Sequence, residues 1–369
     1  MHVLVTADTV GGVWTYAREL VTGLVRRGVR VTLVSFGEIP TASQMEWLDG
    51  LRLVDYHPTA FRLEWMQEAR QDIQASTDYL RSVIDEVRPD LLHFNQFCYG
   101  SLDVPIPRLV VAHSDVVSWW MSVKGHAPAA DSWTSWYRDT VSAGLASATA
   151  VVAPSRWMLS SVEKIYGKPR QARVIYNGRT PTLFNPHVSK SEYLLSVGRL
   201  WDGGKNASIL TQVDPPLPIY VAGAEQHADD ALRGSHKALD DSRPGVHLKG
   251  AQSEGQLRHL FGRASIYAAT SRYEPFGLAP LEAALSRCAL ICNDIPTFRE
   301  LWGHTALYYH NHAESLQHAI HQLHGDRELR LTYANLAYNR ARQRFTADRM
   351  VEDYMDLYQT LVPAGVAAA

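Results

Sequence analysis

The chain has 369 residues, which at roughly 150 residues per domain favours two domains. Lys and Arg number 36 and Asp and Glu number 38, and this net charge of −2 lacks the basic excess of a nucleic-acid-binding protein. No apolar run reaches the roughly 18 residues of a membrane-spanning helix. Three cysteines are too few for a disulfide framework, and Met1 leads straight into strand-like residues without a leader, so we expect a cytoplasmic protein.

The first half of the chain alternates short apolar runs with helical stretches. The runs are apolar on both faces, which is typical of parallel strands covered by helices on each side. The predicted strands are Val3–Val5, Val31–Phe36, Leu91–Phe94, Leu109–Ala112 and Ala150–Val152, with a helix at Val13–Arg27. We therefore predict a doubly wound, Rossmann-like α/β domain over residues 1–177.

The alternation stops at residues 178–190, which are rich in Gly, Pro and Asn and read as a hinge, and it then restarts. The later predicted strands are Tyr193–Val197, Ile219–Ala222, Ile266–Ala269 and Leu290–Cys292, with helices at Glu254–Arg263 and Leu278–Arg287. A second doubly wound domain is thus expected over residues 191–345. Because ligands lie outside the carboxyl ends of parallel strands, two such domains predict a central cleft that holds a ligand from both sides.

The stretch from Thr270 to Ala284 carries the strongest chemical signal. A strand ends at Ala269 and a helix begins near Gly277, since Pro280 is tolerated only in a first helical turn. Free N–H groups at this helix start form a site for an anion such as a diphosphate. Glu282, one turn further in, can accept two ribose hydroxyls, and Glu274 can reach sugar hydroxyls or the reacting centre. An ordinary helix start with two solvated glutamates is the alternative.

A second glycine-rich turn follows the strand that ends at Val197. Arg199 and Lys205 flank it, and two cations beside a crevice can neutralise a diphosphate, Arg by a fork and Lys as a point charge. A solvated turn is the competing interpretation. The spacing is wrong for a P-loop, and Asn206 stands where such a loop carries Ser or Thr.

Two weaker signals lie in the first domain. The pair Gly11-Gly12 follows the first strand, where glycine lets backbone approach a ligand closely, although a plain tight turn fits as well. His113 ends another strand at the expected cleft and can contact a transferred sugar, although a lone His is more often structural. We take Asp115, Trp119 and Trp120, which follow it, as acceptor-side candidates.

Four tryptophans lie close together after His113, in a stretch that reads as a loop over Ser118–His126. Their rings could stack on a sugar or an aromatic acceptor, or pack a core, and we leave both open. They are Trp119, Trp120, Trp133 and Trp136. The segment Phe61–Met66 has mixed charges and lacks the basic face of a membrane-surface helix, which argues against stable membrane association.

No metal site is expected. His318, His321 and His324 are spaced by three on a predicted helix, but no carboxylate or Cys completes a ligand set, and a solvated face is favoured. The sequence has no D-x-D motif, and Asp229-Asp230 and Asp240-Asp241 are adjacent pairs in a predicted loop.

Taken in order, these stretches resemble the family-4 (group 1) retaining glycosyltransferases of the GT-B fold. The most specific element is Glu274 to Glu282, which is similar to the paired-glutamate E-x7-E motif of that family. The resemblance implies two Rossmann-like domains and transfer of a sugar from a nucleotide-diphosphate donor to a sugar or small-molecule acceptor, with retention of anomeric configuration and no cofactor. It also implies that a C-terminal helix at about 346–361 crosses back onto the first domain.

The resemblance also implies roles for single residues. Arg199 and Lys205 would hold the diphosphate, assisted by backbone at Phe276, Gly277 and Leu278, while Glu282 binds the ribose and Glu274 the sugar ring. Gly12 would approach the diphosphate, and His113 the sugar, from the first domain. The sequence identifies neither base, sugar, acceptor nor oligomeric state.

The physical mechanism that fits these residues is metal-independent front-face displacement. Fixed positive groups stabilise the departing diphosphate, and the phosphate takes the acceptor proton, so no enzymic nucleophile is needed. Two alternatives remain: a GT-B-fold nucleotide-sugar epimerase, which needs no acceptor, and a non-catalytic sensor that binds the nucleotide sugar without turnover.

Overall fold

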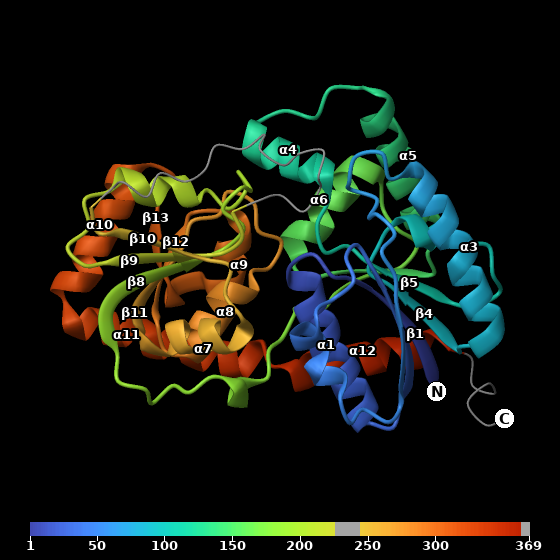
Figure 1. Cartoon of the computed structure of the whole chain (residues 1–369). Helices are drawn as coiled ribbons and strands as arrows, with labels where there is room; N and C mark the ends of the chain where they lie inside the picture. The colour runs from blue at the N-terminus through green and yellow to red at the C-terminus, as the bar shows by residue number, and fades with distance from the viewer. Residues whose placement is uncertain (226–243, 363–369) are drawn as a thin grey trace. The chain divides into compact units, whose positions relative to one another are not determined.

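A computed structural model describes residues 1–225 and 244–362 (Figure 1). The chain divides into two units. Unit 1 holds residues 1–121, 126–178 and the C-terminal residues from Ala347, and unit 2 holds residues 122–125 and 179–346. Of the predicted hinge, residues 178–190, Gly178 falls in unit 1 and residues 179–190 fall in unit 2. The pairs Asp229-Asp230 and Asp240-Asp241 lie outside the described residues.

Unit 1 is built on a seven-stranded parallel sheet in the order β3-β2-β1-β4-β5-β6-β7. Its strands are β1 His2–Asp8, β2 Arg30–Phe36, β3 Val54–Pro58, β4 Leu91–Phe94, β5 Arg108–Val111, β6 Ala150–Ala153 and β7 Ala172–Val174. The helices are α1 Gly12–Arg26, α2 Ala42–Met45, α3 Arg70–Val87, α5 Ser132–Ser147, α6 Arg156–Tyr166 and α12 Ala347–Leu361, with 3₁₀ turns η1 Glu46–Leu48 and η2 Cys98–Ser101. One further helix, α4, spans Val116–Lys124.

Successive side chains of the central strands enter two different cores. Leu4 and Phe94 face the core that α3, α5 and α6 cover, whereas Val3, Val5 and Leu91 face the core that α1 and α12 cover. Strands buried on both faces read as continuous apolar runs, which is why the sequence revealed them.

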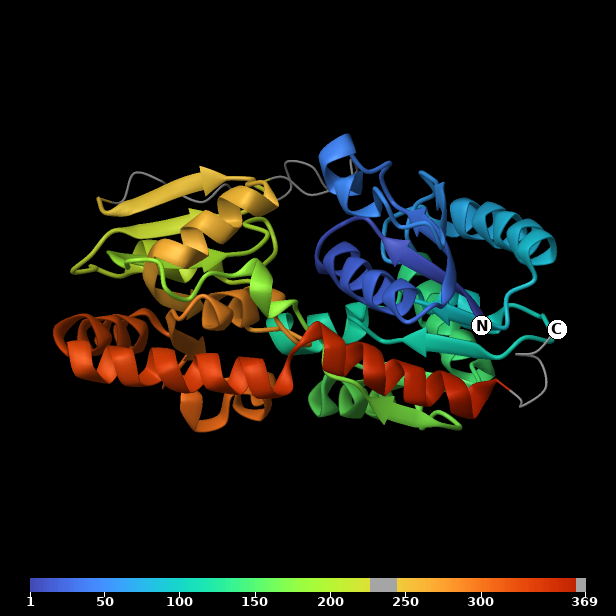
Figure 2. The ribbon, with the colours of Figure 1, turned by 90° about the horizontal axis from the view of Figure 1, so that it is seen from below.

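Helix α12 completes the second of these cores. Met350, Tyr354 and Tyr358 are fully buried against α1 and the sheet, and α12 runs along the sheet of unit 1 in Figure 2. The chain thus returns from unit 2 to pack its last helix on unit 1, as the resemblance implies.

Unit 2 is a six-stranded parallel sheet in the order β10-β9-β8-β11-β12-β13. The strands are β8 Ser191–Val197, β9 Ile219–Ala222, β10 Val246–Gly250, β11 Ala264–Ala269, β12 Ala289–Asn293 and β13 Leu307–Tyr309. The helices are α7 Glu254–Arg263, α8 Leu278–Leu285, α9 Pro296–Trp302, α10 Ala313–Gly325 and α11 Arg327–Arg344, with 3₁₀ turns η3 Pro181–Leu183, η4 Ala207–Gln212 and η6 Gly303–Thr305.

A lysine joins the ends of two helices in unit 2. The Nζ of Lys190 donates to the carbonyls of Gly262 at 2.9 Å and Ser286 at 2.6 Å, at the C-terminal ends of α7 and α8. Carbonyls there have no partner within the helix, and a cation also complements the helix dipole. Cys288 and Cys292 are fully buried in unit 2.

The sequence prediction failed in two instructive ways. The four strands that it missed, β3, β7, β10 and β13, are the four sheet edges, and their half-exposed side chains break the apolar run that marks a central strand. The loop expected over Ser118–His126 was also wrong, since most of it lies in α4. Within the described residues, no helix combines the length and apolarity needed to span a membrane.

We predict that Gly144→Ala destabilises unit 1. An added Cβ on this α5 residue would lie 1.9 Å from the carbonyl oxygen of Phe97, and backbone cannot yield as a flexible side chain does. Helix propensity favours Ala by about 1 kcal/mol, but overpacking costs about 1–3 kcal/mol or more, and an overlap with rigid backbone belongs at the upper end and outweighs it. Urea unfolding followed by tryptophan fluorescence measures the loss.

Gly325→Ala is the matched control for that substitution. Gly325 also lies in a helix, at the end of α10, but nothing lies within 4 Å of an added Cβ. We expect this variant to be as stable as the parent or slightly more so, and equal losses in the two variants would refute the packing argument.

Candidate active site

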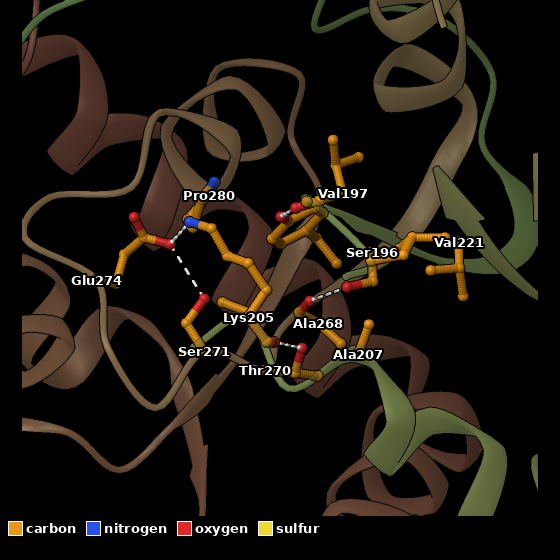
Figure 3. A pocket seen from close by; sticks show the side chains of 14 residues that line it. Ser196, Val197, Lys205, Ala207, Val221, Ala268, Thr270, Ser271, Glu274 and Pro280 are labelled. Carbon is orange, nitrogen blue, oxygen red and sulfur yellow. Dashed lines mark hydrogen bonds and ion pairs between the residues drawn. The ribbon is translucent and has the colours of Figure 1, made fainter. Parts of the chain in front are cut away.

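A pocket opens in unit 2 at the carboxyl ends of β8 and β11 (Figure 3). β8 is followed along the chain by β9 on one side of it, while β11 lies on the other side, so the strand order reverses here. Ligands of open parallel sheets bind at such a reversal. The pocket is lined by Ser196, Val197, Gly198, Leu200, Lys205, Ala207, Val221, Tyr267, Ala268, Ala269, Thr270, Ser271, Glu274 and Pro280.

The turn after β8 lies so close to the end of β9 that only glycine fits. Gly223 has a φ of +151°, and a Cβ there would lie 1.6 Å from the carbonyl oxygen of Gly198. A Cβ on Gly198 would in turn lie 3.3 Å from Cγ of Lys205. Two glycines thus let the backbone pass while the lysine stem packs on it.

A buried carboxylate orders the rest of this turn. Asp202 is 6% exposed and accepts hydrogen bonds from the Gly204 N–H at 2.8 Å and the Arg199 guanidinium at 2.7 Å. Burial alone would raise the pKa of Asp202, but the charges of Arg199 and Lys205 and these hydrogen bonds outweigh it and lower the pKa. Asp202 is therefore a fixed anion at neutral pH.

Lys205 and Glu274 meet in the pocket, as Figure 3 shows. The Lys205 Nζ lies 2.5 Å from Oε2 of Glu274, and the Ser271 hydroxyl donates to the same oxygen at 3.0 Å. The Thr270 hydroxyl donates to the Lys205 carbonyl at 2.7 Å. Both side chains are mostly buried, so the cation is aimed into the pocket with its counter-charge beside it. Thr270 and Ser271 were not predicted as site residues, although both directly follow β11.

Arg199 is not brought into the pocket wall. Its guanidinium pairs with Asp202, lies 5.2 Å from the ring centre of Trp201, and is 39% exposed. The structure therefore places one of the two predicted cations in the pocket and the other on the outside of the same turn. A role for Arg199 toward a diphosphate stays a prediction.

The helix start predicted near Gly277 is confirmed. Gly277 is the N-cap of α8 with a φ of +91°, no side chain caps this end, and Pro280 lies in the first turn. The N–H groups at Leu278 onward therefore lack a capping side chain, which is what an anion site requires. Phe276 is buried, with its ring 5.5 Å from Phe345.

Glu282 is not a lining residue of this pocket. Its Oε1 lies 2.8 Å from Nε of Arg179, a buried residue that the sequence analysis missed. Arg179 belongs to an aperiodic linker, and no spacing in the sequence connects it with Glu282.

The glycine pair of unit 1 opens α1. Gly11 is the N-cap with a φ of +99° and makes no side-chain cap, and Gly12 is the first helical residue. Both are exposed. The positive φ at position 11 favours glycine, whereas Gly12, which has no side chain, leaves the first N–H groups of α1 uncovered.

His113 belongs to a hydrogen-bonded chain at the carboxyl ends of β1, β4 and β5. Its Nε2 lies 2.7 Å from Oδ1 of Asn95, whose Nδ2 donates to the carbonyl of Thr6 at 2.5 Å. Because the Asn95 oxygen is an acceptor, the ring proton of His113 is on Nε2. The ring packs edge-on against Tyr16 at 4.5 Å, and burial lowers the pKa of His113 to about 3. A neutral imidazole results.

A second buried histidine, His93, contacts the hydroxyl of Tyr16. His93 is fully buried, with Nε2 3.2 Å from the Tyr16 hydroxyl and Nδ1 2.6 Å from the Tyr358 hydroxyl of α12. Burial, and to a lesser extent repulsion from the positive charge that His113 carries only when protonated, lowers the pKa of His93 to about 3.

Asp115, an acceptor-side candidate, is 2% exposed. Its carboxylate accepts hydrogen bonds from the Ser118 N–H at 2.7 Å and from the hydroxyls of Tyr166 at 2.6 Å and Tyr137 at 3.2 Å. These contacts cap α4 and join it to α5 and α6, so the geometry favours a structural role for Asp115 over contact with an acceptor.

The four tryptophans fall into two groups. Trp133 donates to the Met66 carbonyl at 3.0 Å, and Trp136 packs on the core of unit 1. Trp119 and Trp120 are only half-buried on α4, edge to face at 6.0 Å. The acceptor hypothesis therefore keeps Trp119 and Trp120 alone.

No group of three metal-binding side chains lies among residues 1–225 and 244–362. On α10, His318 and His321 are exposed, as a solvated face requires, and His324 lies 3.8 Å from Glu192.

Two family models cover most of the chain. The model described as Glycosyltransferase Family 4 matches residues 10–182, and that described as Glycosyl transferases group 1 matches residues 184–340. The chain belongs to the group 1 glycosyltransferases of the GT-B fold.

Curated relatives of this glycosyltransferase are distant. It is 28% identical to the O-antigen chain mannosyltransferase RfbU of Salmonella typhimurium over 43% of this chain, and the match spans only 46% of RfbU. It is 23% identical to the alpha-maltose-1-phosphate synthase of Mycobacterium tuberculosis, over 69% of this chain and 73% of the synthase.

Solved structures share its fold over nearly the whole length. The sucrose-phosphate synthase of Thermosynechococcus elongatus has a TM-score of 0.78 at 15% identity, covering 98% of this chain and 99% of that one. HepE of Anabaena, solved in complex with UDP and glucose, has a TM-score of 0.72 at 17% identity, covering 98% and 100%.

The glycosyltransferase should lose stability in mild acid because His93 is buried neutral. The unfolded chain takes up the proton near pH 6.5 and the folded one only near pH 3, so stability is full above 6.5 and falls as pH drops. At pH 5 this one group costs about 2 kcal/mol. We expect His93→Gln to lower stability at pH 7.5 but to flatten the decline between pH 7.5 and 5.

Urea unfolding at pH 7.5, 6 and 5 measures the two slopes. Eight of the ten tryptophans, all but Trp201 and Trp302, lie in unit 1, so their fluorescence reports chiefly on the unit that holds His93. Parallel pH slopes for the parent and the variant would show that His93 is not the titrating group.

Proposed function

We propose that this glycosyltransferase moves a hexose from a nucleoside-diphosphate sugar to an acceptor hydroxyl with retention of configuration. The observation that carries the proposal is Lys205, a largely buried cation directed into the pocket at the ends of β8 and β11 and held beside Glu274. A diphosphate is the anion that this pocket suits, because Lys205 and the uncapped start of α8 both belong to its surroundings.

The relatives support this donor class. HepE is solved with UDP-glucose, and another relative carries the name GDP-mannose:cellobiosyl-diphosphopolyprenol alpha-mannosyltransferase. We therefore propose a uridine or guanosine diphosphate hexose as the donor. All three cysteines are buried free thiols, which fits the cytoplasmic setting that we also propose.

Each site residue has a proposed role. Lys205 and the backbone of Phe276, Gly277 and Leu278 hold the diphosphate, and Glu274 accepts hydroxyls of the sugar. Glu282 accepts the ribose hydroxyls. For Gly12 and His113 of unit 1 we also propose donor contacts, and the neutral His113 can accept a hydrogen bond from a sugar hydroxyl at Nδ1 because Nε2 is committed to Asn95.

The proposed chemical step needs no enzymic nucleophile. The bond between the anomeric carbon and the diphosphate oxygen breaks while the acceptor oxygen bonds to the same face, and the departing phosphate oxygen takes the acceptor proton. Charge grows on the leaving oxygens in the transition state, where Lys205 stabilises it without reorganisation. Lys205 and the α8 backbone can supply this positive charge without a metal ion.

The direct test is a thermal-shift panel of nucleotide sugars, followed by turnover of the best donor with sugar and small-molecule acceptors. Anomeric NMR of the product decides retention. Product formed without any acceptor would identify an epimerase, and tight binding without turnover across the panel would identify a sensor. Either result overturns the proposal.

Lys205→Met should slow transfer far more than it weakens donor binding. Its charge is most valuable as the diphosphate leaves, so we expect kcat to fall about 100-fold or more and KM to change only a few-fold. Lys168→Met, at an exposed position of unit 1, is the control and should match the parent. A Lys205→Met enzyme with unchanged kcat would remove this residue from the mechanism.

Chelation should leave the reaction intact. Steady-state rates measured with a molar excess of EDTA over enzyme should equal the untreated rate, because the proposed positive charges all come from the chain. A loss that added Mg²⁺ or Mn²⁺ restores would contradict metal independence while leaving the donor class standing.

A further inference from the structure

Arg179 is among the largest fully buried side chains of the protein, at 1% exposed, and it is charged. It is the first residue of unit 2 after the chain leaves unit 1, and its N–H donates to the carbonyl of Phe345 at 3.0 Å, next to the end of the unit. A buried guanidinium is costly unless it is paired, so its partners indicate why it is there.

Its partners are two carboxylates and one ring. Nε lies 2.8 Å from Oε1 of Glu282 on α8, Nη2 lies 3.0 Å from Oε1 of Glu254 at the start of α7, and the guanidinium lies 5.4 Å from the ring centre of Phe184. The three contacts hold the planar group in one orientation, and that group in turn fixes the carboxylates it touches.

The two carboxylates differ in environment. The side chain of Glu254 is 36% exposed and that of Glu282 is 13% exposed. A carboxylate has about four lone-pair sites on its two oxygens, so a carboxylate that is held by a cation can also accept hydrogen bonds from hydroxyl groups. Glu282 is thus an oriented acceptor rather than a freely rotating side chain.

We propose that Arg179 is a positioning residue that holds Glu282 for the ribose hydroxyls of the donor. This inference rests on the proposed function, because it takes the nucleotide ribose as the ligand of Glu282. A carboxylate that is already fixed binds two vicinal hydroxyls more tightly, because ordering a mobile carboxylate on binding costs rotamer entropy that offsets the hydrogen bonds it forms. Because Arg179 orders the Glu282 side chain when the protein folds, this entropy is already lost before the ligand binds.

The consequence is specific to the ribose. Removing Arg179 should weaken binding of a nucleotide that carries the 2′ and 3′ hydroxyls, and should scarcely affect one that lacks them. The ratio of the two dissociation constants isolates this effect, because any loss of folded protein lowers both signals alike and leaves the ratio unchanged.

The experiment measures dissociation constants of the full chain for UDP and GDP and for their 2′,3′-dideoxy counterparts by calorimetry. We expect the parent to bind the better ribonucleotide about tenfold or more tightly than its dideoxy form, given charged hydrogen bonds to two hydroxyls. Arg179→Met should reduce that ratio at least about fivefold. Arg179→Lys, which restores the charge without the fork, should give an intermediate ratio and covers the case in which Arg179→Met does not fold.

Glu254→Gln is the matched control. It alters the same buried cluster but leaves the contact between Arg179 and Glu282, so the ratio should stay within about twofold of the parent if that contact is what matters. An equal collapse in Glu254→Gln would assign the effect to the cluster as a whole and overturn the inference.

The remaining outcomes separate the two proposals. If the parent binds neither UDP nor GDP, the proposed donor is wrong, and the inference falls with it. If the parent binds and discriminates but both Arg179 variants discriminate equally well, the donor stands and the positioning role is refuted. If the parent binds without discriminating, Glu282 does not contact the ribose.

Discussion

The ion pair between Lys205 and Glu274 is the interaction on which the candidate site depends. It joins the turn after β8 to the loop after β11, and the hydroxyl of Thr270 joins the same two segments through the Lys205 carbonyl. The ends of two adjacent parallel strands are thereby held in one arrangement before any ligand arrives. A cation that is already oriented costs nothing to reorganise during reaction, which is the physical basis of electrostatic catalysis.

Backbone constraints place that pair. Gly223 and Gly198 approach so closely that any side chain at Gly223 would force the turn out of position, and Asp202 holds the other end of the turn through the Gly204 N–H. Glycines and one buried carboxylate therefore determine where Lys205 and Glu274 lie. A similar division holds in unit 1, where Asn95 fixes the ring of His113 while Tyr16, His93 and Tyr358 fill the space beneath it.

The sequence predicted the central strands, the start of α8 and the pocket residues Lys205 and Glu274, because each leaves a local signal. Strands buried on both faces are apolar runs, and Gly277 with Pro280 marks a helix start within four residues. The edge strands left no such signal, since half their side chains face solvent. Arg179 left no signal either, because its partners Glu254 and Glu282 become its neighbours only in the folded chain. Helix α4 was missed because its serines and aromatic residues have low helix propensity, whereas the tertiary contacts of Asp115 stabilise the helix.

Each cation around the site has a carboxylate partner, which stabilises the pocket in the absence of a ligand and still allows an anion to bind. Lys205 is balanced by Glu274, Arg199 by Asp202, and Arg179 by Glu254 and Glu282, so no cation in this set is left to repel another. In the proposed reaction, a diphosphate would bring negative charge toward Lys205, which would then divide its attraction between the ligand and Glu274. The sugar hydroxyls of the proposed donor would donate to the Glu274 carboxylate and replace the hydrogen bond that it loses. The pair would thus separate only when a ligand carries both an anion for Lys205 and hydroxyls of a transferred sugar for Glu274. A nucleotide sugar carries both, whereas a free nucleotide has its ribose hydroxyls but no transferred sugar.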